Sequence, residues 1–224
     1  MVKSMSAADQ AKISAAIAAA EAGTDGEIVA ITADTSDAYH DVGLHYAVGV
    51  LFLNLAAYAA WPGLFDWWWS WVAEWSAPLT LQQILTFVLV FALVKFLVVL
   101  FVMKWMPLRL ALTPGATKSR RVRRRALMLF KAAAERRTVG RTAVLIYLSM
   151  GERRAEIIGD EAITAVTTPE TWGEAMTALL VEVRAGRAGD GIVAAVDRVG
   201  SVLAAHFPKT SDDLNEIPDK LIEL

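Results

Sequence analysis

The sequence contains no cysteine and only three histidines in 224 residues. The absence of cysteine excludes disulfides, thiolate zinc sites, iron–sulfur clusters and cysteine nucleophiles. The few, scattered histidines leave little for a transition metal. By contrast, the hydrophobic fraction is 55 % and the mean hydropathy is +0.41, which is higher than an ordinary soluble domain needs. The composition therefore excludes a disordered chain and a disulfide-rich secreted domain, and it favours a membrane-anchored globular protein.

Charge is distributed very unevenly along the chain. Residues 1–103 carry 3 Lys or Arg against 9 Asp or Glu, and residues 151–224 carry 7 against 14. Residues 104–150 carry 12 against 1. The net charge of −2 thus hides a strongly basic block, and that block is more informative about partners than the total.

Two long apolar segments predict a transmembrane helical hairpin at residues 42–106. Not one Lys or Arg occurs from Ala47 to Val94. The first segment runs from Val42 to Trp61 and the second from about Leu79 to Met106. Each is long enough to cross a hydrocarbon core of roughly 30 Å, which takes about 20 helical residues. A pair of buried helices in a soluble bundle is the alternative, but such helices normally keep a polar face.

The residues that flank the hairpin predict its orientation. The loop between the two segments carries only Asp66 and Glu74, whereas Lys104 and Arg109 begin the basic block after the second segment. Positive flanks stay in the cytoplasm, and two crossings return the N-terminus to the same side. We therefore expect a multi-pass protein of the bacterial inner membrane with both termini and the soluble domain in the cytoplasm.

The basic block also suggests a contact surface. We expect its arginines to face anionic lipid headgroups, which attract each Lys or Arg near the leaflet by about 1 kcal/mol. A protein partner is an alternative. Nucleic acid is not expected as a partner, because the block lacks interleaved aromatic residues and any groove-binding motif. The predicted patch consists of Arg120, Arg121, Arg123, Arg124 and Arg125.

Tryptophan is concentrated in the loop of the hairpin. Indole rings settle at the level of the headgroups, so the cluster predicts interfacial anchoring. If the loop is helical, Trp67, Trp71 and Trp75 share one face, since they recur every four residues. A docking surface for another membrane protein or a pigment is the alternative interpretation. The cluster comprises Trp61, Trp67, Trp68, Trp69, Trp71 and Trp75.

Lys95 is the only charge in the core of the second segment. A charge inside a membrane is unfavourable and often functional. It lies about 24 Å along the helix from Leu79, so its long side chain can extend to the inner interface. An ion pair buried between helices is the other interpretation.

The remaining segments alternate between helical and strand patterns. We predict helices over 6–22, 119–137, 169–185 and 192–207, and strands over 27–34, 142–149 and 153–159. The last two strands form a hairpin around a tight turn at Met150 and Gly151. The tail from Pro208 is acidic and is expected on the surface.

Three segments form a recognisable pattern: the strand after Asp25-Gly26-Glu27, the hairpin that ends in Ile157-Ile158-Gly159-Asp160-Glu161, and the helical segments around Gly189-Asp190-Gly191. This pattern resembles the TPM domain family. The tail from Asn215 to Leu224 is similar to that of bacterial members that carry a membrane hairpin. The resemblance implies an α/β/α sandwich with a small central sheet. The transmembrane hairpin interrupts this domain, which is then formed by residues 1–40 and 108–224.

The resemblance also implies candidate functions. Photosystem-associated members suggest a non-catalytic accessory, scaffold or assembly factor for a membrane protein complex, or alternatively a homo-oligomer. Plant members described as acid phosphatases suggest an enzymatic alternative, a weak phosphatase that depends on a divalent cation. Enzymatic activity is the less expected of the two. No cofactor is expected beyond Ca²⁺ or Mg²⁺.

Four acidic residues at the ends of predicted strands are the candidates for a Ca²⁺ or Mg²⁺ site, because hard cations prefer several carboxylate oxygens. They are Asp25, Glu27, Asp160 and Glu161. If their strands are neighbours, these side chains share one edge of the sheet. The structural alternative is that Asp160 caps a helix that begins near Glu161 and that Asp25 belongs to a turn.

Two other segments offer little chemistry. Gly186–Gly191 precedes a predicted helix and offers backbone N–H groups to a phosphate, but a helix end followed by Asp190 as an N-cap explains it fully. His206 fits the end of the last helix, and no G-x-S-x-G motif accompanies it. The sequence therefore predicts no catalytic triad.

Overall fold

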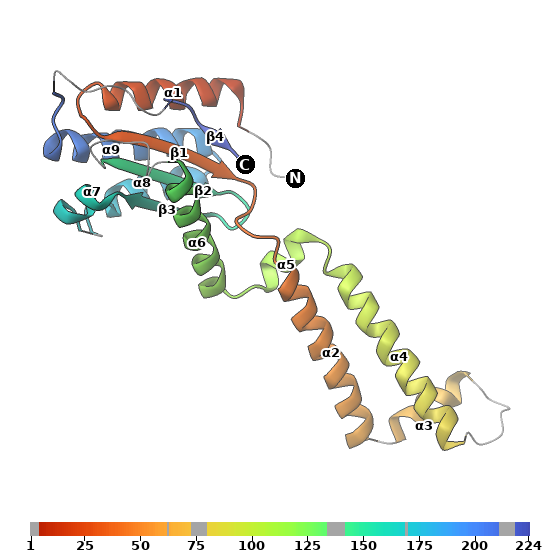
Figure 1. The fold of residues 1–224 in the computed structure, drawn as a ribbon. Helices are drawn as coiled ribbons and strands as arrows, with labels where there is room; N and C mark the ends of the chain where they lie inside the picture. The colour runs from red at the N-terminus through yellow and green to blue at the C-terminus, as the bar shows by residue number, and fades with distance from the viewer. Residues whose placement is uncertain (1–4, 62, 73–79, 134–141, 169, 211–217) are drawn as a thin grey trace. The chain divides into compact units, whose positions relative to one another are not determined.

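The computed structural model describes residues 5–61, 63–72, 80–133, 142–168, 170–210 and 218–224. The chain divides into two compact units (Figure 1). Met1–Asp37 together with Pro114–Leu224 form one, which we call the α/β unit. Ala38–Thr113 form the other, the helical unit.

A four-stranded sheet of order β3-β2-β1-β4 forms the centre of the α/β unit. The strands are β1 (Glu27–Ala33), β2 (Ala143–Ser149), β3 (Arg154–Gly159) and β4 (Ile222–Glu223). β1 pairs in parallel with β2 and with β4, whereas β2 and β3 are antiparallel. Every residue of β1 and β2 is buried, which explains why both strands are almost continuously apolar.

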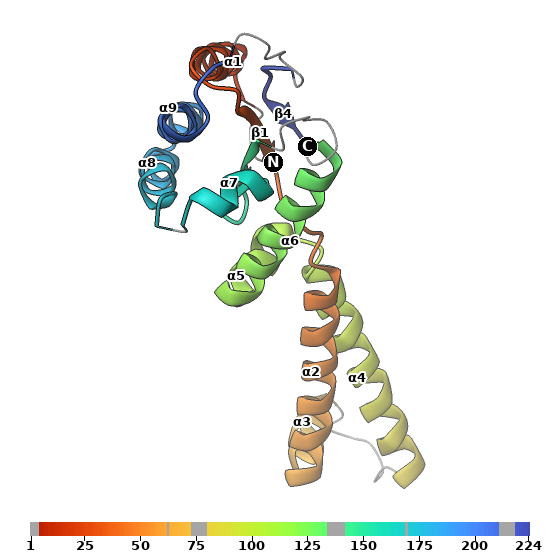
Figure 2. The same cartoon turned by 60° about the vertical axis from the view of Figure 1, so that its left-hand side comes forward.

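Helices cover both faces of this sheet (Figure 2). One face packs against α1 (Ala7–Glu21), α7 (Glu161–Val166), α8 (Gly173–Arg184) and α9 (Ala188–His206). The other face packs against α6 (Gly115–Ala133), through Val122, Ala126 and Phe130. The expected mixed α/β class is thus confirmed.

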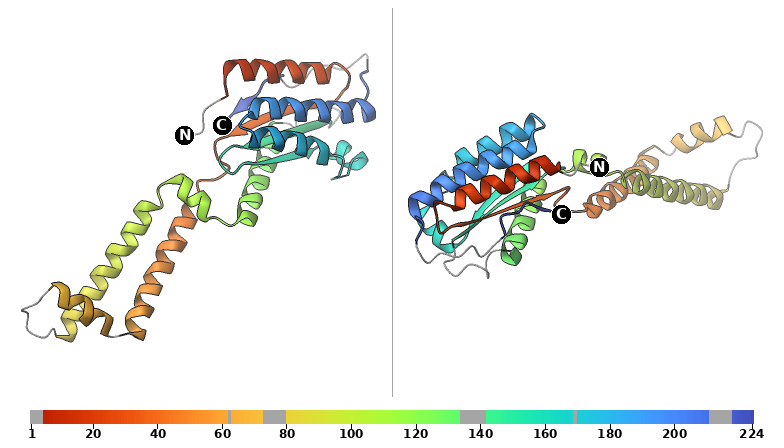
Figure 3. Two further views of the ribbon diagram at one scale, coloured as in Figure 1. Left: turned by 180° about the vertical axis from the view of Figure 1, so that it is seen from behind. Right: turned by 90° about the horizontal axis from the view of Figure 1, so that it is seen from above.

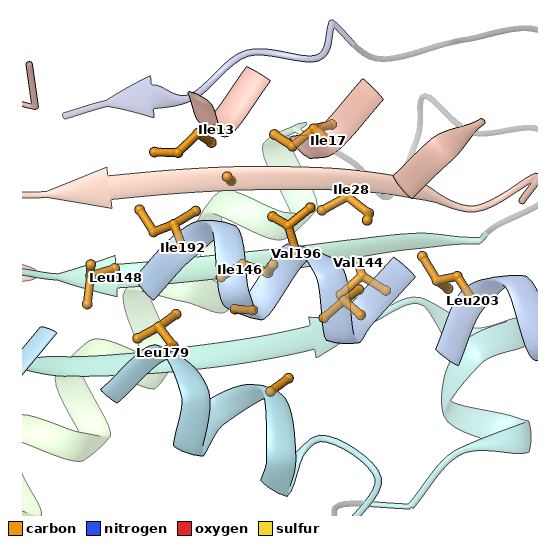
Figure 4. Close-up of a cluster of buried hydrophobic side chains, with 14 of the residues drawn as sticks. Ile13, Ile17, Ile28, Val144, Ile146, Leu148, Leu179, Ile192, Val196 and Leu203 are labelled. Atoms are coloured by element: carbon orange, nitrogen blue, oxygen red, sulfur yellow. The ribbon is translucent and has the colours of Figure 1, made fainter. Parts of the chain in front are cut away.

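The larger apolar core lies between the sheet and α1, α8 and α9 (Figure 4). Ile13 and Ile17 extend from α1, and Ile192 and Val196 from α9, toward strand residues such as Ile146. All five side chains are at most 1 % exposed. The β-branched residues of the strands and the helix residues at spacings of four thus form one contiguous core.

Several predicted boundaries require correction. The last helix begins at Ala188 and not at Ile192, so Gly189, Asp190 and Gly191 lie inside α9. Asp190 is therefore not an N-cap, and its carboxylate instead forms an ion pair with Lys12 of α1 at 3.2 Å. The reason is close packing: a Cβ at Gly191 would lie 2.8 Å from the carbonyl oxygen of Leu179, so a helix can pass there only with glycine.

Other differences are smaller. α6 begins at Gly115, four residues before the predicted start, and α8 begins at Gly173 after a turn at 170–172. The start predicted for α8, Pro169, lies outside the described residues. The turn between β2 and β3 spans residues 150–153, with Arg153 in the left-handed region at φ 51°. The described residues of the tail, 208–210 and 218–224, are exposed or half-buried. Its end also forms β4, which the sequence did not predict.

The helical unit contains α2 (His40–Ala60), α3 (Gly63–Val72), α4 (Leu81–Val102) and α5 (Met106–Leu112). α2 and α4 lie side by side (Figures 1 and 3). The second predicted segment is shorter than expected, because the chain leaves the helix after Val102 and Met106 begins α5. Both α2 and α4 are long and apolar enough to cross a membrane.

Candidate functional site

The four predicted acidic ligands lie near one edge of the sheet, but they do not converge. Register places Glu27 beside Ala143 of β2, and the N–H of Asp160 donates to the carbonyl of the same Ala143 at 2.9 Å. β2 therefore separates β1 from β3, and the two backbones are about 10 Å apart. Among the described residues, no group of three or more Asp, Glu or His side chains is placed to hold a metal ion.

Asp160 is an N-cap, as the structural alternative predicted. Its Oδ1 accepts from the N–H of Glu161 at 2.7 Å, at the start of α7. The residue is 6 % exposed, whereas Glu161 is exposed. Oδ2 of Asp160 has no hydrogen-bond partner in the described part of the chain. Asp160 thus has a clear local structural role at the end of β3.

Asp25 anchors the chain that follows α9. Its carboxylate accepts from the backbone N–H of Thr210 at 2.7 Å and from the Thr210 hydroxyl at 2.8 Å. The backbone N–H of Thr210, with a smaller contribution from its hydroxyl and from Lys209, lowers the pKa of Asp25. Asp25 is therefore an ionised turn residue that joins two distant parts of the α/β unit.

Glu21, which the sequence did not single out, is the most perturbed carboxyl at this edge. It is 8 % exposed, and its Oε1 accepts from the N–H of Ile28 at 2.7 Å. Burial raises its pKa to about 8, the nearby charges of Glu27 and Asp219 raise it further, and the bond from Ile28 opposes the rise. One feature of the sequence could have identified Glu21. It lies in the last turn of the predicted helix, where the negative end of the helix dipole disfavours a carboxylate.

A second polar cluster lies at the opposite ends of β1 and β2. Glu152, in the turn after β2, accepts from the backbone N–H of Ser36 at 2.8 Å and from the hydroxyl of Ser149. The Ser36 hydroxyl lies 3.0 Å from the hydroxyl of Tyr147, and burial raises the pKa of that tyrosine. These bonds hold the chain where it leaves the α/β unit. Ser36 is far in sequence from Tyr147 and Glu152, and the pairing of β1 with β2 brings these residues together.

The five arginines of the predicted lipid-facing patch have different surroundings. Arg121 forms an ion pair with Asp37 at 3.2 Å, and Arg123 forms one with Glu156 at 3.6 Å. Arg121 and Arg125 are half-buried, whereas Arg120, Arg123 and Arg124 are exposed. The exposed basic surface of α6 is therefore smaller than the sequence indicates.

The tryptophan cluster is helical where it is described. Trp67 and Trp71 of α3 lie edge to face at 6.3 Å, as expected for residues four apart on one helix face. Their exposed fractions are 61 % and 78 %, and that of Trp61 is 67 %. Trp69 instead contacts Phe87 of α4 at 5.1 Å. Trp75 and the side chain of Trp68 lie outside the described residues.

Lys95 contacts α2 rather than extending toward the end of α4 at Val102. Its Nζ donates to Oδ1 of Asn54 and lies 5.8 Å from the centre of the Tyr58 ring. Neither of the two predicted arrangements, extension to the interface or an ion pair, describes this geometry. Its partners are an amide and an aromatic ring.

Arg109, which the sequence analysis counted only as part of the basic block, has a structural role. It is 7 % exposed. Its guanidinium donates to the carbonyl of Ala38 and, at 3.0 Å, to that of Lys104. It therefore ties the beginning of α2 to the chain that follows α4, and it closes the hairpin at that end.

Comparison with known proteins gives two findings. The family model described as TPM domain matches residues 113–202. The structure of BA42 protein from the psychrophilic bacterium Bizionia argentinensis, solved by NMR, is similar with a TM-score of 0.57 over 100 % of this chain and 98 % of that chain, at 17 % identity. That likeness concerns the fold alone. No curated protein matches the chain. The resemblance predicted from sequence is thus confirmed over residues 113–202, which match the TPM domain model.

Proposed function

We propose that this chain is a membrane-anchored TPM-domain protein that acts as an accessory, scaffold or assembly subunit of a membrane protein complex. The observation that carries the proposal is the exposure of α2 and α4. Only 17 % and 6 % of their most apolar 18-residue windows is buried within the chain. The core helix of a soluble protein would be mostly buried, whereas a helix in lipid exposes its apolar side chains.

The charges that flank the two helices support one orientation of the chain in the membrane. Lys104, Lys118 and the arginines of α6 follow the second helix, and the residues between the helices include no Lys or Arg. The positive-inside rule then supports an inner-membrane protein with the α/β unit and both termini in the cytoplasm. The exposed Arg120 and Arg124 are available to anionic headgroups in that orientation.

The decisive test combines anchoring and partner capture. The full chain, expressed in bacteria, should stay in the membrane pellet through an alkaline carbonate wash. Purification in a mild detergent should then yield a membrane protein at fixed stoichiometry. Release by carbonate contradicts the anchor, and a chain that purifies alone or only as a homo-oligomer contradicts the accessory role.

Orientation can be tested with cysteine labelling, because the natural chain has none. An impermeant maleimide added to spheroplasts should label Ser70→Cys in α3. It should label Arg123→Cys in α6 only after the membrane is permeabilised. The reverse pattern would place the α/β unit on the outer side.

The phosphatase alternative has its own measurement. The purified chain is assayed on a generic phosphomonoester with and without Mg²⁺ or Ca²⁺. Cation-dependent activity that is lost in Glu27→Gln and Asp160→Asn would overturn the non-catalytic proposal. Activity that survives both substitutions would place the chemistry away from these two residues.

A further inference from the structure

Lys95 gives the helical unit a positive charge that its own neighbours do not neutralise. In the described part of the chain, the ammonium contacts the amide oxygen of Asn54 and the ring of Tyr58. Both partners are neutral. No carboxylate of the described residues forms an ion pair with it, and the Lys95 side chain is exposed.

The position of this charge is far from either end of the hairpin. Lys95 lies 14 residues after Leu81 and 7 before Val102, or about 21 Å and about 10 Å from the ends of α4. Asn54 lies 14 residues after His40 and 6 before Ala60. The lysine begins in the inner half of α4 and contacts the outer half of α2. Its ammonium is thus held between the two ends.

Within α2 and α4, no acidic residue could neutralise Lys95 from a second copy at the same depth. Asp41, at the start of α2, is the only Asp or Glu in α2 and α4 together. Around Lys95 the surface of α4 is apolar: Val94, Leu97 and Val98 are 49 %, 53 % and 53 % exposed. The site is therefore a single cation on an otherwise apolar surface suited to lipid or to another helix.

We propose that Lys95 is the docking point for a transmembrane helix of a different protein, which supplies an Asp or Glu at mid-membrane depth. The proposal rests on the proposed function, since it requires α2 and α4 to span the membrane, and it specifies how the partner is recognised. A charge in hydrocarbon is stabilised most by an opposite charge, and the contacts of the ammonium with Asn54 and Tyr58 do not supply one. Phosphate groups of lipids lie at the ends of the span and not at this depth.

Designed transmembrane peptides test this recognition directly. The labelled full chain is reconstituted in phosphatidylcholine vesicles with a labelled polyleucine peptide of about 20 residues that carries one Glu at its centre. Association is measured by energy transfer. We expect the Glu peptide to bind about three to ten times more tightly than matched peptides with Gln or Leu at that position. Equal binding of the three peptides contradicts the proposal.

Substitutions at Lys95 and Asn54 distinguish binding of the partner helix from a contact that only joins α2 to α4. Lys95→Met should abolish the preference for the Glu peptide, and Lys95→Arg should keep it. Asn54→Leu removes the neutral partner and leaves the cation, so the preference should persist. If Asn54→Leu and Lys95→Met lose the preference alike, Lys95 only joins α2 to α4. Persistence of the preference in Lys95→Met would also overturn the proposal.

Failure of the inference is distinguishable from failure of the proposed function. If the chain does not remain in vesicles after a carbonate wash, the membrane anchor itself is wrong. If it remains anchored and shows no preference among the peptides, only the role of Lys95 is wrong. Lys118→Met, a substitution of the same kind outside α4, is the matched control and should leave the preference unchanged.

Discussion

The two units of this chain bury their apolar residues in opposite ways. In the α/β unit, all seven residues of β2 are buried, including Val144, Leu145 and Ile146. In the helical unit, α4 is even more apolar, yet Leu89 and Phe101 are 68 % and 71 % exposed. The difference teaches that apolar composition alone does not determine burial. The membrane location proposed for the helical unit would account for the difference, because lipid removes the advantage of hiding apolar side chains inside the protein.

Leucine truncations should separate the two units most strongly. Leu145→Ala removes a side chain that is 0 % exposed in the α/β unit and should lower the free energy of unfolding by about 3 kcal/mol. Leu97→Ala, at 53 % exposed in α4, should change it by less than about 0.5 kcal/mol. Thermal unfolding of the full chain in detergent measures both. Comparable losses would show that α4 is packed inside protein.

An arginine substitution in α4 should have an effect of similar size but of a different kind. Leu89→Arg in α4 should disfavour membrane insertion by about 3 kcal/mol, because a charge at that depth loses its hydration. Val181→Arg on α8, which is 54 % exposed, should leave insertion unchanged. The fraction of chain recovered in the carbonate-washed membrane checks the pair. An insertion defect in both variants would mean that the assay reports misfolding.

The buried carboxyl of Glu21 should make the stability of the α/β unit depend on pH. Its pKa rises from an ordinary 4.5 to about 8 in the fold. The stabilisation is therefore fully present below pH 4.5 and is lost as the pH rises through 8. Glu21→Gln should accordingly stabilise the fold at pH 9 by about 2 kcal/mol, after allowance for solvent screening, with the difference disappearing toward pH 5. Denaturant titrations at both pH values measure it.

The smallest expected effect concerns a helix cap in the α/β unit. Ser6 accepts from the N–H of Asp9 at 3.1 Å, so Ser6→Ala should lower the free energy of unfolding by about 1 kcal/mol. Ser201 is an exposed serine inside α9 whose hydroxyl donates to the carbonyl of Asp197 at 2.8 Å. Ser201→Ala should be nearly neutral. Denaturant unfolding distinguishes the two, and equal losses would argue against the cap.

Helices and strands were predicted correctly where the hydrophobic residues follow a single helical or strand periodicity. The apolar runs of β1 and β2 and the two long apolar helices follow from side-chain spacing and composition. The start of α9 was predicted too late, because two glycines resemble a helix end. They are there because α8 and α1 approach closely: a Cβ at Gly189 would lie 2.8 Å from the side chain of Asp9. Such a requirement cannot be seen in local sequence.

For the candidate acidic site, the sequence predicted the location at the strand ends but not the distances between the side chains. Sequence placed acidic residues at strand ends, and strand pairing decided that β2 separates Glu27 from Asp160. Glu21 was missed because its burial depends on the packing of α1 near the beginning of β1, where Ile28 donates to it. The contact between Lys95 and Asn54 was missed for the same reason, since it joins residues 41 positions apart.

By itself, the sequence indicated a resemblance to the TPM domain and two helices apolar enough to cross a membrane, because hydropathy and periodicity act over short stretches of chain. Only the tertiary structure decided which polar groups meet: Glu21 with Ile28, Asp25 with Thr210, and Lys95 with Asn54. The physical reason is range. A hydrogen bond acts over about 3 Å, and only folding brings distant segments that close.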